Sequence, residues 1–314
     1  MNKHINLFRI KSKCLVVLLC MFSTLFVACK FDQNTSQPLT TDEMQSNQMQ
    51  QANIGNIVLE YQVQGTGEPI LFIHGSAIAD TFLTLMPEPA LSGYTLIRYR
   101  RRGYTGSSDV EDPFSMADQA SDAAALLDYL NISKAHIVGH SYGAATALQL
   151  ALDNPNKVHS LVLMEPPVTP PGDFPPPRGV VEGMGVYMSG DPEGAVDVFL
   201  KWALGDDWEA DTELATPGGA AQAKESAKTL FEVEVPALGQ WQFTQVEASR
   251  IHHPALYIGG SLSVDELKAA LPFLKQWIPQ LEEHIIQDVN HGLHAKKPQE
   301  VALSIEKFLS QNTF

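Results

Sequence analysis

A serine lies between two glycines in the stretch Gly-His-Ser-Tyr-Gly, residues 139–143, where an apolar run ends and small residues follow. The pattern favours a tight turn from a strand into a helix, because glycine adopts backbone angles that other residues avoid. It is also the G-x-S-x-G pattern of a nucleophile elbow, in which the serine hydroxyl stands exposed on a strained turn. The chemistry predicted for Ser141 is nucleophilic attack on an acyl carbonyl, followed by release of the acyl group by water.

Such a serine needs a base to take its proton and an acid to orient that base. Candidates for the base are His291, which lies in a loop after an apolar run and is followed by glycine, and His294, three residues further on. The predicted acid is Glu165, at the end of the apolar run Leu-Val-Leu-Met. A carboxylate buried there needs a partner that offsets its desolvation, and a protonated histidine supplies one.

The elements that must position these residues alternate along the chain. Expected strands cover residues 56–65, 68–75, 94–103, 134–141, 158–167, 254–260 and 283–292, and expected helices cover residues 116–130, 142–155, 264–277 and 298–310. Continuous apolar strands such as 68–75 indicate a sheet that is buried on both faces. We therefore predict an α/β fold, with a mostly parallel sheet flanked by helices.

One stretch interrupts this alternation. Residues 166–178 hold seven prolines, which exclude a helix interior or a central strand. The residues that follow, to about position 250, have helical patterns and no strand-like run. We interpret residues 167–250 as a helical cap inserted into the domain 54–314; the alternative is an irregular surface excursion.

The strand–turn–helix context around Ser141 resembles the α/β-hydrolase family, and the resemblance covers nearly everything after residue 53. Residues 72–76, Phe-Ile-His-Gly-Ser, resemble the family's oxyanion loop. The resemblance implies that the backbone N–H of Ser76 or Ala77 joins that of Tyr142 in binding the oxyanion. It also implies that His291, in the loop after the last expected strand, is the base. The start of the helix after Ser141 also offers unpaired N–H groups and a positive dipole end.

The acid departs from the common pattern of this family. Many members carry it in the loop after the strand that residues 254–260 resemble, where this chain has Ser263. A serine cannot stabilise an imidazolium as a carboxylate does. Some branches carry the acid at the end of the preceding strand, which is the position of Glu165. The resemblance therefore favours Glu165 and leaves Asp265 as the second candidate.

A second departure lies at residues 99–108, Tyr-Arg-Arg-Arg-Gly-Tyr-Thr-Gly-Ser-Ser. The stretch resembles the family's Asp-x-Arg-Gly-x-Gly-x-Ser segment, but Arg100 stands where Asp is common. Three consecutive arginines could clamp an anionic group of a substrate. The alternative, favoured here, is that they are structural ties to carboxylates or carbonyls.

The resemblance implies a serine hydrolase that cleaves an ester-type bond (a carboxylic ester, lactone or thioester) in a small, partly hydrophobic acyl substrate, with no cofactor and no metal. Haloalkane dehalogenases and epoxide hydrolases of this fold use Asp as nucleophile, so Ser141 argues against both. Two alternatives stay open: a carbon–carbon bond hydrolase, and a binding protein that keeps the fold but turns over slowly or not at all.

The first residues of the chain predict export. Four basic residues precede an apolar run, residues 14–28, which is shorter than a membrane-spanning helix requires. The sequence Phe-Val-Ala-Cys at its end resembles the lipobox of bacterial lipoproteins, and this implies cleavage of residues 1–28 and acylation of Cys29. The expected location is the cell envelope, in the outer membrane if the cell is Gram-negative, and otherwise secretion. An ordinary signal peptide or an uncleaved anchor is the alternative.

Composition bounds what remains after such cleavage. Residues 29–53 are polar and poor in large apolar residues, so we predict a flexible tether. All three cysteines lie within the first 29 residues, which leaves the folded part without a disulfide or a thiolate metal site. The net charge of the chain is −15, and loss of four basic residues makes it −19. A field of this sign repels nucleic acid, so no nucleic-acid partner is expected.

Overall fold

The computed structural model describes residues 48–110, 113–168 and 175–314. The predicted signal segment 1–28, the acylation site Cys29 and residues 29–47 of the predicted tether lie outside these ranges and stay predictions. Residues 169–174 of the proline-rich stretch also lie outside them. Within the described ranges, no helix combines the length and the apolar character that crossing a membrane requires.

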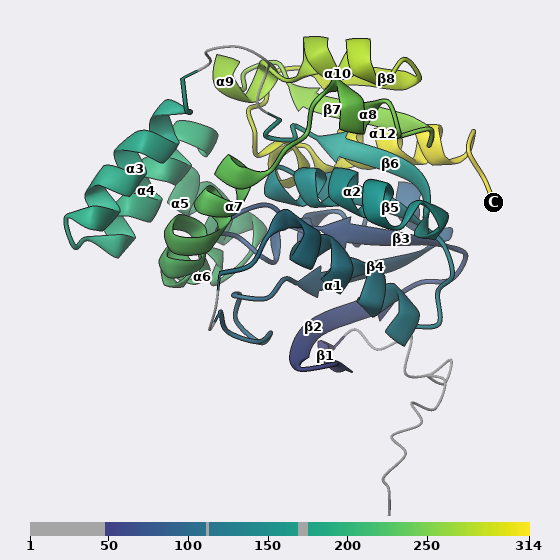
Figure 1. Ribbon diagram of the computed structural model, residues 1–314, viewed down its shortest axis with the longest axis horizontal. Coiled ribbons are helices and arrows are strands. Elements are labelled where there is room, and N and C mark those ends of the chain that lie inside the picture. The colour runs from purple at the N-terminus through teal and green to yellow at the C-terminus, as the bar shows by residue number, and fades with distance from the viewer. Residues whose placement is uncertain (1–47, 111–112, 169–174) are drawn as a thin grey trace, which may run out of the picture. The chain divides into compact units, whose positions relative to one another are not determined.

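One mixed sheet organises the described residues (Figure 1). Its strands are β1 (Gln50–Ile54), β2 (Ile57–Gln64), β3 (Glu68–Ile73), β4 (Tyr94–Arg100), β5 (Ala135–His140), β6 (Val158–Met164), β7 (Ala255–Gly260) and β8 (Leu281–Ile286). The spatial order is β1-β2-β4-β3-β5-β6-β7-β8, and β1 and β2 are antiparallel to their neighbours while β3 to β8 pair in parallel. The predicted α/β fold with a mostly parallel sheet is confirmed.

The first strand lies where the sequence predicts a tether. The predicted tether extends to residue 53, whereas Gln50–Ile54 forms β1 and pairs with β2. This strand is polar, with Ala52 buried among exposed and half-buried neighbours. Backbone hydrogen bonds to β2 hold an edge strand whatever its side chains are, so composition alone does not reveal it.

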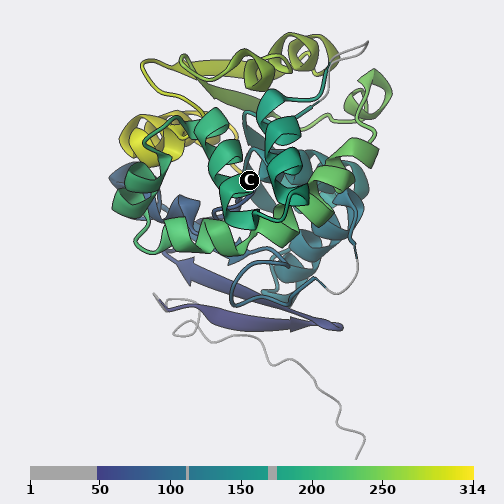
Figure 2. The same ribbon diagram turned by 90° about the vertical axis from the view of Figure 1, so that its left-hand side faces the viewer.

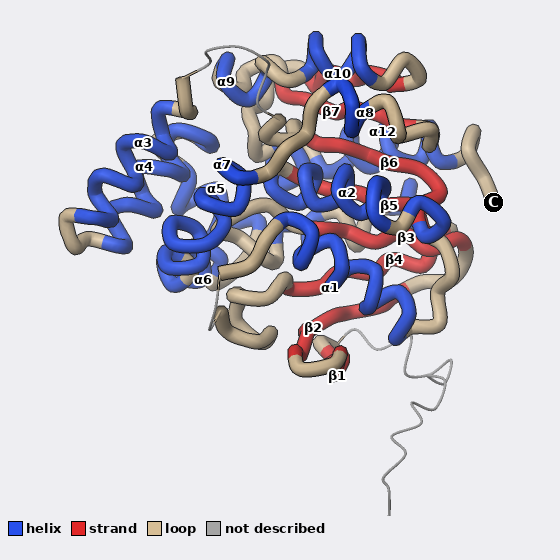
Figure 3. Tube along the Cα trace, viewed as in Figure 1, coloured by secondary structure: helices blue, strands red, loops and turns tan. Residues whose placement is uncertain are grey.

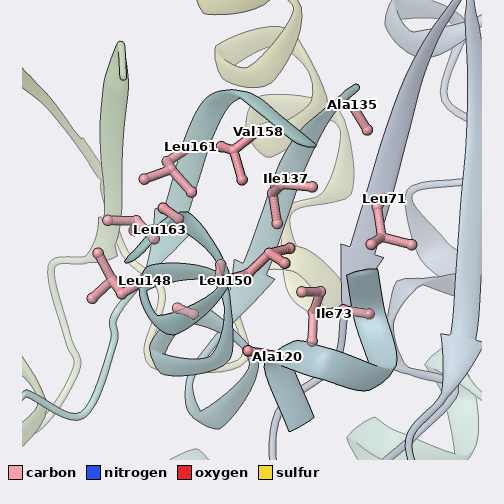
Figure 4. Packing of buried hydrophobic residues seen from close by; sticks show 14 of the residues in the cluster. Leu71, Ile73, Ala120, Ala135, Ile137, Leu148, Leu150, Val158, Leu161 and Leu163 are labelled. Carbon is pink, nitrogen blue, oxygen red and sulfur yellow. The ribbon is translucent and has the colours of Figure 1, made fainter. Parts of the chain in front are cut away.

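Helices cover both faces of the sheet (Figure 3). They are α1 (Met116–Tyr129), α2 (Tyr142–Asp153) and α10 (Leu271–Trp277) on one face and α12 (Pro298–Leu309) on the other. Figure 4 shows Leu148 and Leu150 of α2 among residues of β5 and β6, such as Ile137 and Leu163. Successive residues of a strand point to opposite faces. In β3, for example, Leu71 packs with α2 and Phe72 packs with α12. The core strands are therefore buried on both faces of the sheet.

The predicted helix 264–277 is broken into α9 (Asp265–Lys268) and α10. Pro272 lies in the first turn of α10, where a missing N–H costs nothing. The same proline cannot continue a helix that starts at Asp265, because its ring clashes with the carbonyl one turn earlier. The break therefore follows from Pro272, and the prediction of a single helix over residues 264–277 was wrong.

A helical segment separates β6 from β7. It contains α3 (Arg178–Met188), α4 (Pro192–Leu204), α5 (Trp208–Ala215), α6 (Gly219–Glu225), the π-helix η5 (Thr229–Glu234), α7 (Val235–Gln240) and α8 (Gln245–Ala248). Figures 1 and 2 show α3 to α7 gathered at one end of the sheet, and we call residues 178–240 the cap. The cap has its own apolar cluster, which includes Trp208 and Phe231. Ala77 and Ile78, from the loop after β3, belong to the same cluster.

Candidate active site

Ser141 forms the junction of β5 and α2. Its backbone angles are φ 51° and ψ −122°, a region that residues with a side chain avoid. Its N–H donates to the carbonyl of Met164 on the neighbouring strand at 2.8 Å. The sheet therefore holds the turn in place, as the strained geometry of a nucleophile elbow requires.

The two glycines beside Ser141 allow the backbone to turn this tightly. A Cβ atom added at Gly143 would overlap the carbonyl oxygen of Ile73, and one added at Gly139 would overlap the carbonyl oxygen of Gly143. Backbone atoms of a central strand, or of the helix packed on it, cannot move away as a flexible side chain can. The requirement for glycine is therefore steric at both positions.

We expect Gly143→Ala to destabilise the protein by about 3 kcal/mol, because the added methyl group forces β3 and α2 apart. The matched control is Gly185→Ala in α3, where no atom lies within 4 Å of the added Cβ and alanine favours a helix. Urea unfolding of both variants gives the free energies of unfolding. Equal stability of the two variants would contradict the steric role of Gly143.

His291 and Glu165 form a buried pair. The His291 Nδ1–H donates to Glu165 Oε2 at 2.5 Å, and the residues are 4% and 0% exposed. The other carboxylate oxygen of Glu165 accepts from the N–H of Gly260 at 2.8 Å. Glu165 has a φ of 45°, a strained value for a residue with a side chain, directly after the last residue of β6. With Nδ1 engaged, Nε2 of His291 is the nitrogen left to accept a proton.

The carboxylate of Glu165 is held in its ionised form. Burial opposes ionisation, but the hydrogen bond and charge of His291 and the N–H of Gly260 outweigh it and lower the pKa of Glu165. The Ser263 hydroxyl also faces this carboxylate and contributes to the lower pKa, although its geometry falls short of a regular hydrogen bond. Ser263 therefore helps to keep the carboxylate of Glu165 ionised, and it does so from the position where many family members carry the acid itself.

The alternative acid lies elsewhere. The carboxylate of Asp265 is 99% exposed and pairs with Lys268 on the same short helix, at 3.2 Å. It makes no contact with a histidine among the interactions of the described residues. The structure brings Glu165 to His291 and leaves Asp265 in solvent.

One pocket reaches both the predicted nucleophile and the predicted base. Ser141 and His291 both line it, together with Gly75 and Ser76. In the described part of the chain no hydrogen bond links Ser141 to His291. Such bonds are commonly long in enzymes without substrate and tighten when it binds. The two residues thus share one cavity, and Nε2 of His291 is free for the serine proton.

The loop after β3, residues 74–80, lies at the same pocket, and we call it the oxyanion loop because it overlaps the segment 72–76 that resembles the family's loop of that name. The N–H of Ala77 donates to the Tyr104 hydroxyl at 3.0 Å, so it is not available to a substrate. No hydrogen bond in the described part of the chain uses the N–H of Ser76 or that of Tyr142, the first residue of α2. Of the two donors that the sequence left open, Ser76 is the one that the geometry leaves free.

Two more histidines pack around His291. The ring of His140 lies 4.4 Å from that of His291 and 4.2 Å from that of His294, measured between centroids. The Nε2–H of His140 donates to the His291 carbonyl at 3.0 Å, and His294 bonds to Thr81. Burial, with the nearby charge of His291, lowers the pKa of His294 to about 3. His294 therefore stays neutral, whereas His291 has the carboxylate that can stabilise its cation.

The three consecutive arginines form ion pairs with carboxylates, which confirms the favoured prediction. The pairs are Arg100 with Asp80 and Glu60, Arg101 with Glu234, and Arg102 with Asp122. None of the three arginines lines the pocket. Burial opposes ionisation of Asp80, but Arg100 and Arg98 outweigh it and lower its pKa to about 2.

A second serine–histidine–glutamate set lies elsewhere in the sheet. Nδ1 of His136 is 2.7 Å from the Ser160 hydroxyl, and its Nε2 is 3.1 Å from Glu68. Ser160 is fully buried, and none of the three residues lines the pocket. Residue types and distances alone therefore do not identify a candidate active site. The side chains must also be reachable by a substrate from a pocket.

Sequence reasoning missed one buried acid near the site, Glu234 of η5, which pairs with Arg101. Its only signal is its place in the run Leu-Phe-Glu-Val-Glu-Val, where two acids alternate with apolar residues; Glu232 is exposed and Glu234 is buried. No group of three or more His, Cys, Asp or Glu residues that could hold a metal ion occurs within the described ranges.

The comparisons with known proteins fit this geometry. The chain is 26% identical over 259 residues to a provisionally named esterase/lipase of Haemophilus influenzae, covering 80% of this chain and 87% of that one. It is 26% identical over 264 residues to 2-hydroxymuconate semialdehyde hydrolase of Pseudomonas putida, covering 79% and 89%. The chain spans less than half the length of several other curated relatives.

Solved structures resemble the chain in the same region. The enol-lactonase from Burkholderia xenovorans LB400 superimposes with a TM-score of 0.70 at 19% identity, covering 83% of this chain and 100% of that one. The family model of the alpha/beta hydrolase fold matches residues 68–298, from β3 to the start of α12. With most of its length matched, the chain belongs to the alpha/beta hydrolase fold family.

Proposed function

We propose that this protein is a serine hydrolase that cleaves an ester-type bond, in a carboxylic ester, a lactone or a thioester, through an acyl-enzyme on Ser141. The observation that carries the proposal is the 2.5 Å contact between His291 and Glu165, beside the pocket that Ser141 lines. A buried, ionised carboxylate on Nδ1 fixes the histidine tautomer that accepts a proton at Nε2. The set of His136, Glu68 and Ser160 differs because it has no access from the pocket, whereas the half-buried Ser141 lines the pocket beside His291.

The proposed reaction follows from these positions. Nε2 of His291 takes the proton of Ser141 as the serine oxygen attacks the carbonyl carbon of the substrate. The N–H groups of Ser76 and Tyr142 stabilise the negative charge on the carbonyl oxygen. His291 then gives its proton to the leaving group, and a water molecule activated by His291 hydrolyses the acyl-enzyme. Glu165 offsets the charge of His291 in both steps.

The pocket walls favour a small, partly hydrophobic acyl or alcohol group. The apolar part of the lining comes mainly from the cap and includes Phe199, Trp202 and Leu204 of α4, with Ile78 of the oxyanion loop. One ion pair, Asp211 with Lys296 at 2.7 Å, also belongs to the lining. A wall of this composition takes up apolar chains by burying their surface.

A series of p-nitrophenyl esters with acyl chains of increasing length tests this proposal. We expect kcat/KM to be highest for short to medium chains and to fall for chains that outgrow the pocket. Lactones and thioesters with the preferred acyl group complete the series. Folded protein that hydrolyses none of the three classes would exclude the ester-type assignment and favour a binding role on the same fold.

A carbon–carbon bond hydrolase is the second candidate, and the match to the Pseudomonas putida hydrolase favours it. A serine with a histidine base can serve this reaction as well. A substrate with a carbon–carbon bond next to a ketone decides between the two. A kcat/KM at least 100-fold above that of the best ester would favour this second candidate.

A further inference from the structure

The oxyanion loop contains a strained turn beside its free donor. The N–H of Ile78 donates to the Ser76 carbonyl at 2.9 Å, which closes a three-residue turn around Ala77. Ala77 has a φ of 68°, a value that favours glycine. Strained turns persist only where neighbouring groups hold them. The groups that hold this turn therefore also set where the Ser76 N–H points.

Arg101 fixes the peptide unit that carries this donor. Its Nη2–H donates to the Gly75 carbonyl at 2.9 Å, and its Nε–H donates to the His74 carbonyl at 3.1 Å. The carbonyl of Gly75 and the N–H of Ser76 belong to one trans peptide, so they point in opposite directions. Binding of the Gly75 oxygen by Arg101 therefore turns the Ser76 N–H away from Arg101, and Ser76 lines the pocket.

A carboxylate from the cap holds both groups that brace the loop. Glu234 Oε1 lies 2.6 Å from Nη2 of Arg101 and accepts from the Tyr104 hydroxyl at 2.9 Å. The side chains of Arg101 and Glu234 are both 0% exposed. The same Tyr104 hydroxyl accepts the N–H of Ala77. Glu234 thus holds Tyr104, which supports the strained turn, and Arg101, which fixes the peptide that carries the Ser76 N–H.

Other contacts tie the cap to the oxyanion loop and to the loop after β4. The N–H of Ala79 donates to Gln222 Oε1 of the cap at 3.0 Å, and the Thr229 hydroxyl donates to the Gly103 carbonyl at 2.7 Å. Ala77 and Ile78 pack in the apolar cluster of the cap. The guanidinium of Arg101 also lies over the ring of Tyr142, 4.5 Å from its centroid. Arg101, which pairs with Glu234 of the cap, therefore contacts both the peptide that carries the Ser76 N–H and the side chain of Tyr142.

We infer that Arg101, Tyr104 and Glu234 are positioning residues for the oxyanion hole, and that the seating of η5 determines how well the site stabilises the transition state. The inference rests on the proposed function. Because the negative charge on the carbonyl oxygen is absent from the bound substrate and develops in the transition state and the tetrahedral intermediate, a misplaced Ser76 N–H lowers kcat and leaves substrate binding unchanged. The cap then contributes to catalysis as well as to the pocket wall.

The test uses Glu234→Gln in the full-length protein, with kcat, KM and the affinity for an alkyl boronic acid that forms a tetrahedral adduct on the serine. We expect kcat to fall by roughly 10²-fold, the boronate affinity to fall in parallel, and KM to stay within about 3-fold. The matched control is Glu232→Gln, an exposed acid of the same π-helix that bonds to Tyr187, and it should match the wild type in all three.

A second variant covers the case in which Glu234→Gln does not fold, since it leaves Arg101 buried without its counter-charge. Tyr104→Phe keeps the ion pair and removes the acceptor of the Ala77 N–H, and we expect kcat to fall by roughly 10-fold with KM unchanged. Folded variants with wild-type kcat and boronate affinity, or with a raised KM alone, would overturn the inference. Wild-type protein without any hydrolysis or boronate binding would instead contradict the proposed function.

Discussion

The substitution Glu165→Gln is expected to lower kcat by roughly 10⁴-fold while KM changes little. The Glu165 carboxylate accepts the Nδ1–H of His291 at 2.5 Å and is held ionised there. An amide of the same size carries no charge to stabilise the imidazolium, and it can bind the wrong tautomer of the ring. Initial rates on the best ester of the chain-length series measure the loss.

Asp265→Asn is the matched control for this experiment, because it removes a carboxylate from the alternative acid position. Its side chain is 99% exposed, so we expect kcat to stay at the wild-type value. Thermal unfolding of both variants separates a loss of catalysis from a loss of fold. A large loss for Asp265→Asn with little for Glu165→Gln would move the acid to the loop after β7.

The substitution Ser141→Ala is expected to lower kcat by roughly 10⁶-fold and to abolish the burst of the first product that an acyl-enzyme gives. Only the nucleophilic oxygen is removed, so substrate binding in the pocket should persist. Stopped-flow measurements with a p-nitrophenyl ester report both the burst and the steady rate.

Ser160→Ala is the control for the nucleophile, because Ser160 also bonds to a histidine that contacts a glutamate. It is fully buried away from the pocket, so we expect an unchanged kcat. A residual burst in Ser141→Ala that disappears on further loss of Ser160 would show that the wrong serine had been assigned.

Much of the fold could be predicted because its signals are local. Apolar runs of the right length gave the parallel strands, and Gly139 and Gly143 marked the turn at Ser141. The acid could be ranked from the chain alone, because Ser263 stands where a carboxylate was expected. The structure brings Glu165 to His291 and has Ser263 beside the same carboxylate.

The remainder depends on contacts between residues far apart in the chain. The polar strand β1 exists because of its backbone bonds to β2, which no side-chain pattern encodes. The pairing of Arg101 with Glu234 joins a strand end to a π-helix of the cap. Periodicity predicts which face of an element is buried, but it does not name the partner that neutralises a buried charge.

We propose that Ser141, His291 and Glu165 act as one nucleophilic unit. Mass spectrometry of the folded protein after treatment with a fluorophosphonate tests it most directly. We expect a single adduct on Ser141, absent in Ser141→Ala and formed far more slowly in Glu165→Gln. No adduct on folded protein, or an adduct on Ser141 that forms at the same rate in Glu165→Gln, would contradict it.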